Sequence, residues 1–430
     1  MKRIVLIALF FSGVVEVEAQ ILRLQDAINI ALKNSLNIEI ARNNIEASHI
    51  SNHASVAGGL PTVTGSLTDN QAVTNLNQKL SNGTTTIRSG NAINSLNAGV
   101  TASFVISNGF RIYAARSRLR ALERLSEQQV VMQIQNIMAN VMVKYYDIVR
   151  QQSYVNTIQQ AINVTFQQKQ IIEARQSVGL ANNADKFQAQ LDLNAAQQEL
   201  LSQELVLNQS KTDMMNLLTQ RPDSSFEIRD TIVVDSTIQV QMVLDSLQNN
   251  PELLSAEQQI RINEFIVREV RAQRYPAISI NTGYNYNRNQ NAAGFTLLNQ
   301  TNGPFIGLGV QVPIFNGGLL KRQERVARID IRNAAVTRET LLNEMKTATV
   351  RAWQVYRNNL SRLQTERENN KVAAALLNLT LKRLELSAAT IIEVREAQRS
   401  FVEAGYRLVN LAYAAKVAEI ELKRIASQLL

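Results

Sequence analysis

Apolar and polar side chains alternate along several stretches of the chain. Residues 275–287, YPAISINTGYNYN, have one apolar face, which comprises Ile278, Ile280, Thr282, Tyr284 and Tyr286. Residues 305–315 repeat the pattern with Ile306, Leu308, Val310, Val312 and Ile314. A weaker copy earlier in the chain comprises Leu96, Ala98, Val100, Ala102, Phe104 and Ile106. A period of two predicts β-strands, each of about ten residues.

Strands of this length are long enough to cross a bilayer at a tilt, with lipid-facing and lumen-facing residues alternating. A half-buried strand of a sandwich would show the same alternation. The stretches 70–95 and 289–303 are rich in Asn, Thr, Ser and Gly and are predicted to be extracellular loops, which favours membrane strands. Four strands leave two open edges that lipid does not tolerate, so the chain is expected to oligomerise to close a barrel.

A second pattern, with apolar residues three and four apart, predicts long helices. Residues 111–178 contain neither Gly nor Pro and would form a helix about 100 Å long. The corresponding residues 319–386 have the same length. The apolar positions mark a narrow coiled-coil seam; they are Ile134, Ile137, Val141, Tyr145, Ile148, Val155, Ile158, Ile162 and Phe166. Gly179, in EARQSVGLANNADKFQAQ, is the only glycine between Gly109 and Gly283, and it predicts a hairpin tip.

The pattern occurs twice. With a shift of 215 residues, ALKNSLNI (31–38) aligns with SLQNNPEL (246–253), and Pro61 aligns with Pro276. With a shift of 208, GVTASFVISNG (99–109) aligns with GLGVQVPIFNG (307–317). A tandem repeat is therefore predicted. Its segments are a signal peptide at 1–19, a first repeat at 20–215, a linker or equatorial segment at 216–239 and a second repeat at 240–430.

The first residues, MKRIVLIALFFSGVVEVEAQ, predict a secretory signal peptide that is cut after Ala19. They begin with two basic residues, continue with a short apolar run and end in a small-residue cleavage pattern. A buried first helix is the alternative interpretation. No later run of 18 apolar residues occurs, which excludes a helical inner-membrane protein. The chain has no Cys, so disulfides, a lipid-anchored cysteine and thiolate metal sites are excluded.

The formal net charge of +9 and a pI near 9.7 raise the possibility of nucleic-acid binding. Predicted export argues against it, and basic residues alternate with acids, as in KRQERVARIDIRNAAVTRE (321–339), which indicates a solvated helix face. His49 and His53 have a metal-compatible i, i+4 spacing. Because no third ligand is evident, they are interpreted as ordinary polar positions and no metal or cofactor is expected.

The repeat and several short motifs resemble those of TolC-like outer membrane efflux proteins. The motifs are the two repeat openings, Pro61 and Pro276 at strand starts, the Asn-Gly pairs 108/109 and 316/317, RPDSSFEI (221–228) and the RQSVGL tip (175–180). The resemblance implies a mainly α protein with transmembrane β-strands. Its fold would be a homotrimer whose twelve strands form an outer-membrane barrel continuous with a periplasmic α-helical barrel, in a Gram-negative bacterium.

The resemblance also implies partners. A passive, non-enzymatic exit duct of this family works with a periplasmic adaptor, or membrane fusion protein, and with an inner-membrane RND, ABC or MFS transporter, in contact with outer-membrane lipid. Two alternatives stay open: a duct of type I protein secretion, and a periplasmic coiled-coil adaptor or structural protein.

The resemblance further implies two groups of site residues. The first tip matches the family's Arg-x-x-x-Gly-Leu pattern and is expected to contact the adaptor through Arg175, Val178, Gly179 and Leu180. The second tip, RLELSAATIIEV, has Ser387 in place of glycine, and its expected contacts are Arg383, Ser387, Ala388 and Ala389. Glu393 and Glu396 correspond to lumen-facing acids at a constriction. Repeated three times, they would form rings of carboxylates that favour cations; a surface ion pair of Glu396 with Arg399 is the alternative.

Overall fold

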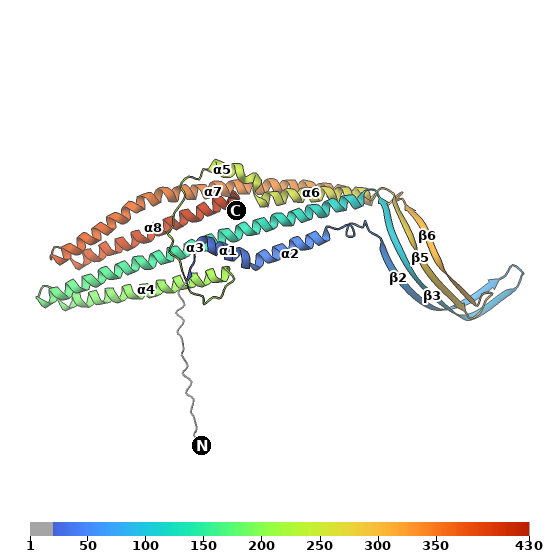
Figure 1. Ribbon diagram of the computed structural model, residues 1–430, viewed down its shortest axis with the longest axis horizontal. Coiled ribbons are helices and arrows are strands. Elements are labelled where there is room, and N and C mark those ends of the chain that lie inside the picture. The colour runs from blue at the N-terminus through green and yellow to red at the C-terminus, as the bar shows by residue number, and fades with distance from the viewer. Residues whose placement is uncertain (1–19, 430) are drawn as a thin grey trace, which may run out of the picture. The chain divides into compact units, whose positions relative to one another are not determined.

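A computed structural model describes residues 20–429, so the predicted signal peptide lies outside the described residues. The helices are α1 (Leu24–Asn34), α2 (Leu36–Ser51), α3 (Arg111–Ser177), α4 (Asn183–Leu217), α5 (Val240–Ser246), η1 (Leu247–Asn249), α6 (Pro251–Ala272), α7 (Leu319–Glu385) and α8 (Ile391–Ile425). The strands are β1 (Gln20–Ile21), β2 (Thr62–Lys79), β3 (Thr85–Asn108), β4 (Phe226–Glu227), β5 (Ala277–Asn291) and β6 (Leu298–Gln311) (Figure 1).

The chain divides into two compact units. The sheet unit comprises Ile40–Val131 and Pro251–Asn343. The hairpin unit comprises Met132–Asn250 together with the described residues of Met1–Glu39 and Glu344–Leu430. Helices α2, α3 and α7 each contribute residues to both units. Among residues 20–429, no helix combines the length and the apolar character that crossing a membrane requires.

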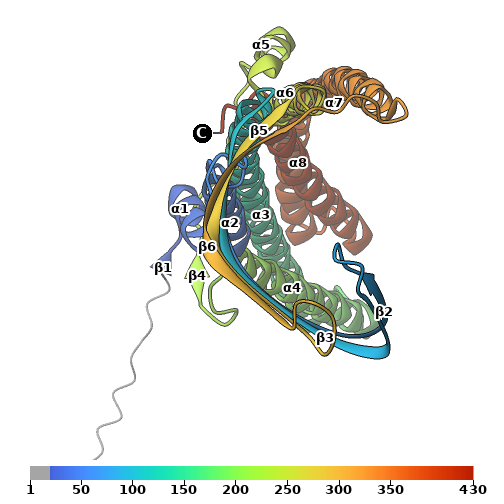
Figure 2. The same ribbon diagram turned by 90° about the vertical axis from the view of Figure 1, so that its right-hand side faces the viewer.

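In the sheet unit, four strands form one antiparallel sheet in the order β2-β3-β5-β6. The sheet is a curved band in Figure 2. β3 and β5, which come from the two halves of the sequence, pair along its centre. The predicted strands are confirmed, and the prolines Pro61 and Pro276 stand immediately before β2 and β5. β2 and β6 are the outer strands, so each leaves one edge unpaired within the chain.

The strands are longer than predicted, with 18, 24, 15 and 14 residues in β2, β3, β5 and β6. The prediction that residues 70–95 form a loop was therefore wrong: β2 continues to Lys79 and β3 starts at Thr85. The predicted loop at 289–303 is likewise shorter, since β5 ends at Asn291 and β6 starts at Leu298. Hydrogen bonds between paired strands join backbone N–H and C=O groups and do not depend on the side chains. Segments rich in Asn and Thr can therefore extend the hairpins.

β6 also ends earlier than the alternation predicted. It stops at Gln311, so Val312 and Ile314 are not part of the strand. Proline lacks an N–H group for the ladder, and Pro313 therefore interrupts strand pairing at this position.

The two long helices match their predicted bounds to within one residue. α3 and α7 have 67 residues each, and α4 and α8 have 35 residues each. The bounds of α7 and α8 follow those of α3 and α4 by 208 residues, which is the predicted repeat shift. Without Gly or Pro, nothing in α3 opposes a continuous helix, and the first break occurs where Gly179 allows a turn.

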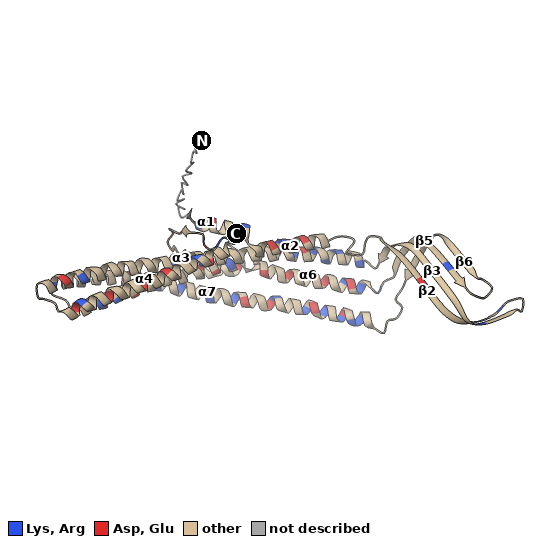
Figure 3. Cartoon of the chain, turned by 90° about the horizontal axis from the view of Figure 1, so that it is seen from below, with Lys and Arg blue, Asp and Glu red and all other residues tan. Residues whose placement is uncertain are grey.

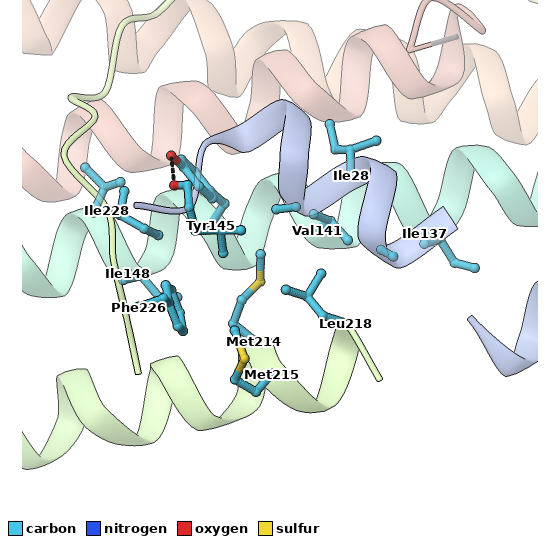
Figure 4. Close-up of a cluster of buried hydrophobic side chains, with 14 of the residues drawn as sticks. Ile28, Ile137, Val141, Tyr145, Ile148, Met214, Met215, Leu218, Phe226 and Ile228 are labelled. Atoms are coloured by element: carbon cyan, nitrogen blue, oxygen red, sulfur yellow. Dashed lines mark hydrogen bonds between the residues drawn. The ribbon is translucent and has the colours of Figure 1, made fainter. Parts of the chain in front are cut away.

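The core of the hairpin unit lies along the predicted seam of α3. Ile137, Val141, Tyr145 and Ile148 are buried against α1, the end of α4 and β4, as Figure 4 shows. The Tyr145 hydroxyl donates to the Leu22 carbonyl oxygen at 3.1 Å. Ile158 and Ile162 continue the seam against Leu193 of α4. Phe166 does not, because its side chain is 48% exposed, so the predicted seam ends before it.

The segment before α5 is held on α8 by a buried ionic network. The backbone N–H of Asp235 donates to Glu419, which is 1% exposed. Lys416 and Lys423 each donate to Glu419 at 2.9 Å, and Lys423 also lies 3.3 Å from the Asp235 carboxylate. A buried carboxylate needs such partners. This network fixes the connection between the two halves of the chain to the hairpin unit.

Candidate functional site

The first hairpin tip is a closed helix end of the Schellman type. The Leu180 N–H donates to the Arg175 carbonyl oxygen at 2.8 Å, and the Gly179 N–H donates to that of Gln176 at 3.0 Å. Gly179 has φ +79°, a left-handed conformation that glycine adopts without a Cβ penalty. The predicted role of Gly179 in the turn is confirmed.

The second tip forms the same turn without glycine. The Ala388 N–H donates to the Arg383 carbonyl oxygen at 2.7 Å, and the Ser387 N–H donates to that of Leu384 at 3.0 Å. Ser387 has φ +58° and so occupies the position of Gly179. The Arg383 guanidinium donates to the Ala388 carbonyl oxygen at 2.8 Å, whereas Arg175 reaches the Leu180 carbonyl oxygen at 3.5 Å.

The two tips border a common groove of about 480 Å³ in the hairpin unit. It is lined by residues of both tips, among them Arg175, Asp185, Arg383, Ser387, Ala388, Ala389 and Glu393. Val178 and Leu180 do not line it; they are 68% and 63% exposed. The structure thus brings most predicted tip residues together and presents apolar side chains beside a groove with charges of both signs.

Capping boxes begin the returning helices. Asn182 and Asp185 exchange hydrogen bonds between side chain and backbone at the start of α4. Thr390 and Glu393 do the same at the start of α8, where the Thr390 N–H donates to the Glu393 carboxylate at 2.6 Å. This role of Glu393 was missed by the sequence analysis, although the Thr-x-x-Glu spacing signals it.

The cap changes the electrostatics of Glu393. The backbone N–H of Thr390, then its hydroxyl and the positive charge of Arg383, lower the pKa of Glu393 below its ordinary value. The Arg383 guanidinium lies 3.9 Å from this carboxylate. Hydrogen bonds that favour the charged form keep a carboxylate ionised. Glu393 is therefore an anion in the groove between the tips.

Glu396 lies one turn further along α8 and is exposed. Arg399 donates to Glu403 at 2.9 Å, and this hydrogen bond and the negative charges of Glu403 and then Glu396 raise the pKa of Arg399. Glu396 thus acts on Arg399 through its charge, while the hydrogen bond of Arg399 goes to Glu403. Arg395, between the two acids, lies 3.7 Å from Asp192 of α4.

The two histidines have separate partners in the sheet unit. His49 Nδ1 lies 2.6 Å from the carboxylate of Glu123, and His53 Nδ1 lies 2.8 Å from the hydroxyl of Ser55. Within residues 20–429, no three His, Cys, Asp or Glu side chains are grouped to hold a metal ion.

Comparisons with known proteins agree with this architecture. A model of the outer membrane efflux protein family matches residues 27–220 and 243–428. The outer membrane protein TolC of Vibrio cholerae is 22% identical over 317 residues, 70% of each chain. The structure of VceC from Vibrio cholerae has a TM-score of 0.76 and 17% identity over 94% of this chain and 95% of that one. The Campylobacter jejuni CmeC channel has a TM-score of 0.73 and 16% identity over 94% and 85%. The chain belongs to the outer membrane efflux protein family, whose members are channels, and it acts in efflux at the outer membrane.

Proposed function

We propose that the chain is the passive exit duct of a tripartite efflux system and has no enzymatic activity of its own. The observation that carries this proposal is the joining of an open-edged four-stranded sheet to two helices of 67 residues in one chain. The sheet has the alternation and length of membrane strands. Helices of that length reach far beyond a bilayer, towards periplasmic partners.

The open edges support a homotrimer. Twelve strands from three copies would close a barrel in which β2 of one protomer pairs with β6 of the next, since these are the outer strands of the sheet. In this arrangement the segments 20–215 and 240–430 are two structural repeats, joined by the linker 216–239. Each repeat would supply half of the strands that one protomer adds to the β-barrel and half of the helices that it adds to the α-helical barrel.

Introduced cysteines test the trimer cleanly, because the chain has none of its own. One cysteine is placed along β2 between Val63 and Val73, and another along β6 between Ile306 and Val310. At the correct register, oxidation is expected to give a covalently closed trimer on a denaturing gel. Cysteines placed on β3 and β5, which pair within one chain, should give only monomers with an internal disulfide. A conducting, monodisperse monomer would contradict the proposal.

The tips are the proposed contact with the periplasmic adaptor, through which an RND, ABC or MFS transporter delivers its substrate. The exposed Val178 and Leu180 and the charged groove beside them support this assignment. An apolar anchor next to groups that fix orientation is a common feature of interfaces.

Glu393 and Glu396 are the proposed constriction. The acids are one turn apart on α8, and a trimer would repeat them three times. In planar bilayers, the Glu393→Gln, Glu396→Gln double variant is expected to lose cation preference and block by multivalent cations.

Two further variants separate this role from capping. Glu396→Gln alone is expected to give part of the loss. Asp185→Asn weakens the cap of the other tip and removes one acid from the groove but none from the proposed ring, so its loss of selectivity should be smaller than that of Glu396→Gln. If the double variant conducts and selects ions like the unmutated channel, the acids do not line the constriction.

A further inference from the structure

The excess positive charge of the chain is concentrated where the helices of the sheet unit meet the strands. The stretches 109–124, 268–274 and 319–332 contain 13 basic and 4 acidic residues, an excess equal to the net charge of +9. The rest of the chain has 32 of each. Figure 3 shows blue segments along α6 and α7 up to their strand-side ends. This distribution points to an anionic partner close to the strand ends.

Three of these 13 basic residues form ion pairs with acids, and two of the others lie side by side on α6. Arg118 lies 2.5 Å from Glu269, and both Arg274 and Arg328 pair with Glu324. Arg268 and Arg271 are exposed on α6, and no carboxylate of the described residues forms an ion pair with either.

Arg268 and Arg271 line a cavity of about 300 Å³ between α6 and the start of α3. Three aromatic residues also line it: Phe110 and Tyr113 at the start of α3 and Tyr275 after α6, which are 77%, 72% and 52% exposed. Gly109 allows this close approach, since a Cβ there would lie 2.6 Å from the Ala272 carbonyl oxygen. The Arg268 guanidinium lies over the Phe265 ring, 5.1 Å from its centroid, which leaves its N–H groups without a carboxylate partner. The cavity therefore combines exposed aromatic rings with guanidinium groups that no carboxylate neutralises.

The cavity lies on the outer side of a ring of helices. α3 contacts α2 through Glu123 and Ser126, and α6 through Arg118. Viewed along the axis of α3, the direction of Arg118 and the direction of Glu123 and Ser126 divide the helix surface into a narrow and a wide arc. At about 100° of rotation per residue, Tyr113 and Ser117 lie on the wide arc. In a closed ring of helices, the directions from one helix to its two neighbours make an angle below 180° on the inner side of the ring. The wide arc of each helix therefore faces outwards. This step rests on the proposed barrel.

We propose that this cavity binds the headgroup phosphate of an anionic phospholipid in the periplasmic leaflet of the outer membrane. Membrane-spanning strands place their helix-side ends at that boundary, where aromatic side chains gather. Guanidinium groups bind phosphate through paired hydrogen bonds, and basic residues near an anionic leaflet contribute to lipid attraction.

The test uses the full channel, purified in neutral detergent, with phosphatidylglycerol and phosphatidylcholine as competing lipids. Native mass spectrometry counts the lipids retained. We expect selective retention of phosphatidylglycerol, with an apparent affinity about 30-fold weaker in the Arg268→Gln, Arg271→Gln variant, which corresponds to about 2 kcal/mol. The matching Arg→Lys variant should keep most of the affinity. Arg261→Gln with Arg338→Gln removes two charges of the sheet unit that lie outside the three basic stretches and should have no effect.

Three results would overturn the inference: equal retention of both lipids, full affinity in the Arg268→Gln, Arg271→Gln variant, or displacement of lipid by inorganic phosphate at equal concentration. The last result would indicate a site for free anions. Trimer formation and conductance of the unmutated protein in phosphatidylcholine bilayers test the proposed duct separately. A conducting trimer without lipid preference therefore contradicts only the lipid site.

Discussion

The two hairpin tips make the same turn from different residues. Gly179 holds the left-handed position of the first tip and Ser387 that of the second, at φ +79° and +58°. The closing hydrogen bonds are nearly equal, 2.8 Å and 2.7 Å. A residue with a Cβ loses about 1–2 kcal/mol in this conformation. The left-handed backbone conformation of the second tip is therefore less favourable for Ser387 than the same conformation is for Gly179.

Flanking side chains explain how the second tip keeps the turn. Arg383 donates to the Ala388 carbonyl oxygen at 2.8 Å, whereas the equivalent bond of Arg175 is 3.5 Å. Thr390 contributes both its N–H and its hydroxyl to Glu393. The turn is thus specified by helix caps on both sides, and glycine is one of several ways to complete it.

The largest expected effect is that of Gly179→Val. No atom lies within 4 Å of an added Cβ at Gly179, so the cost is backbone strain, about 1–2 kcal/mol or more for a β-branched residue. Hydrogen-exchange protection of the Leu180 N–H should fall, and efflux and cross-linking to the adaptor should fall with it. Barrel insertion should be unchanged.

Gly179→Ser is the matched control, because it gives the first tip the residue of the second. It should keep most of the efflux activity. If a well-expressed Gly179→Val strain shows normal efflux and normal cross-linking, the glycine is only a convenient helix break and the first tip has no special role in adaptor contact.

Much of the fold could be predicted because the apolar period and the local propensity agree along the long helices and the strands. The 67-residue helices have no competing conformation until Gly179 or Ser387. The strand lengths were underestimated because polar residues at 70–79 and 85–95 are typical of loops, yet hairpin pairing extends through them. Phe166 fits the apolar period but is 48% exposed, since periodicity does not show where a neighbouring helix provides contacts.

At the site, the sequence predicted the tips but not their electrostatics. The Gly179 turn follows from residue type. The capping role of Glu393 requires a helix start at Ile391, which the Thr-x-x-Glu spacing of Thr390 and Glu393 signals but the prediction from the tip glycine pattern did not use. The ionic network around Glu419 joins residues about 180 positions apart, a distance that local patterns do not bridge.

An intermediate effect is expected from acidification. Because the folded pKa of Glu393 is below its ordinary value of 4.5, its cap contributes stability at higher pH and loses it as pH falls through the folded pKa. Exchange protection in the first turn of α8 should therefore decrease in acid below about pH 4.5. Glu393→Gln should remove this pH dependence. Equal acid sensitivity in that variant would show that another group is responsible.

The smallest effect should come from Ser387→Gly, which makes the second tip resemble the first. Relief of the left-handed strain at Ser387 favours the folded tip by about 1–2 kcal/mol, while the added freedom of glycine in the unfolded chain offsets about 0.5–1 kcal/mol. The net gain should be below about 1.5 kcal/mol, seen as slower exchange of the Ala388 N–H. Unchanged or faster exchange would mean that Arg383 and the Thr390 cap already relieve the strain, so that the two tips differ in sequence but not in stability.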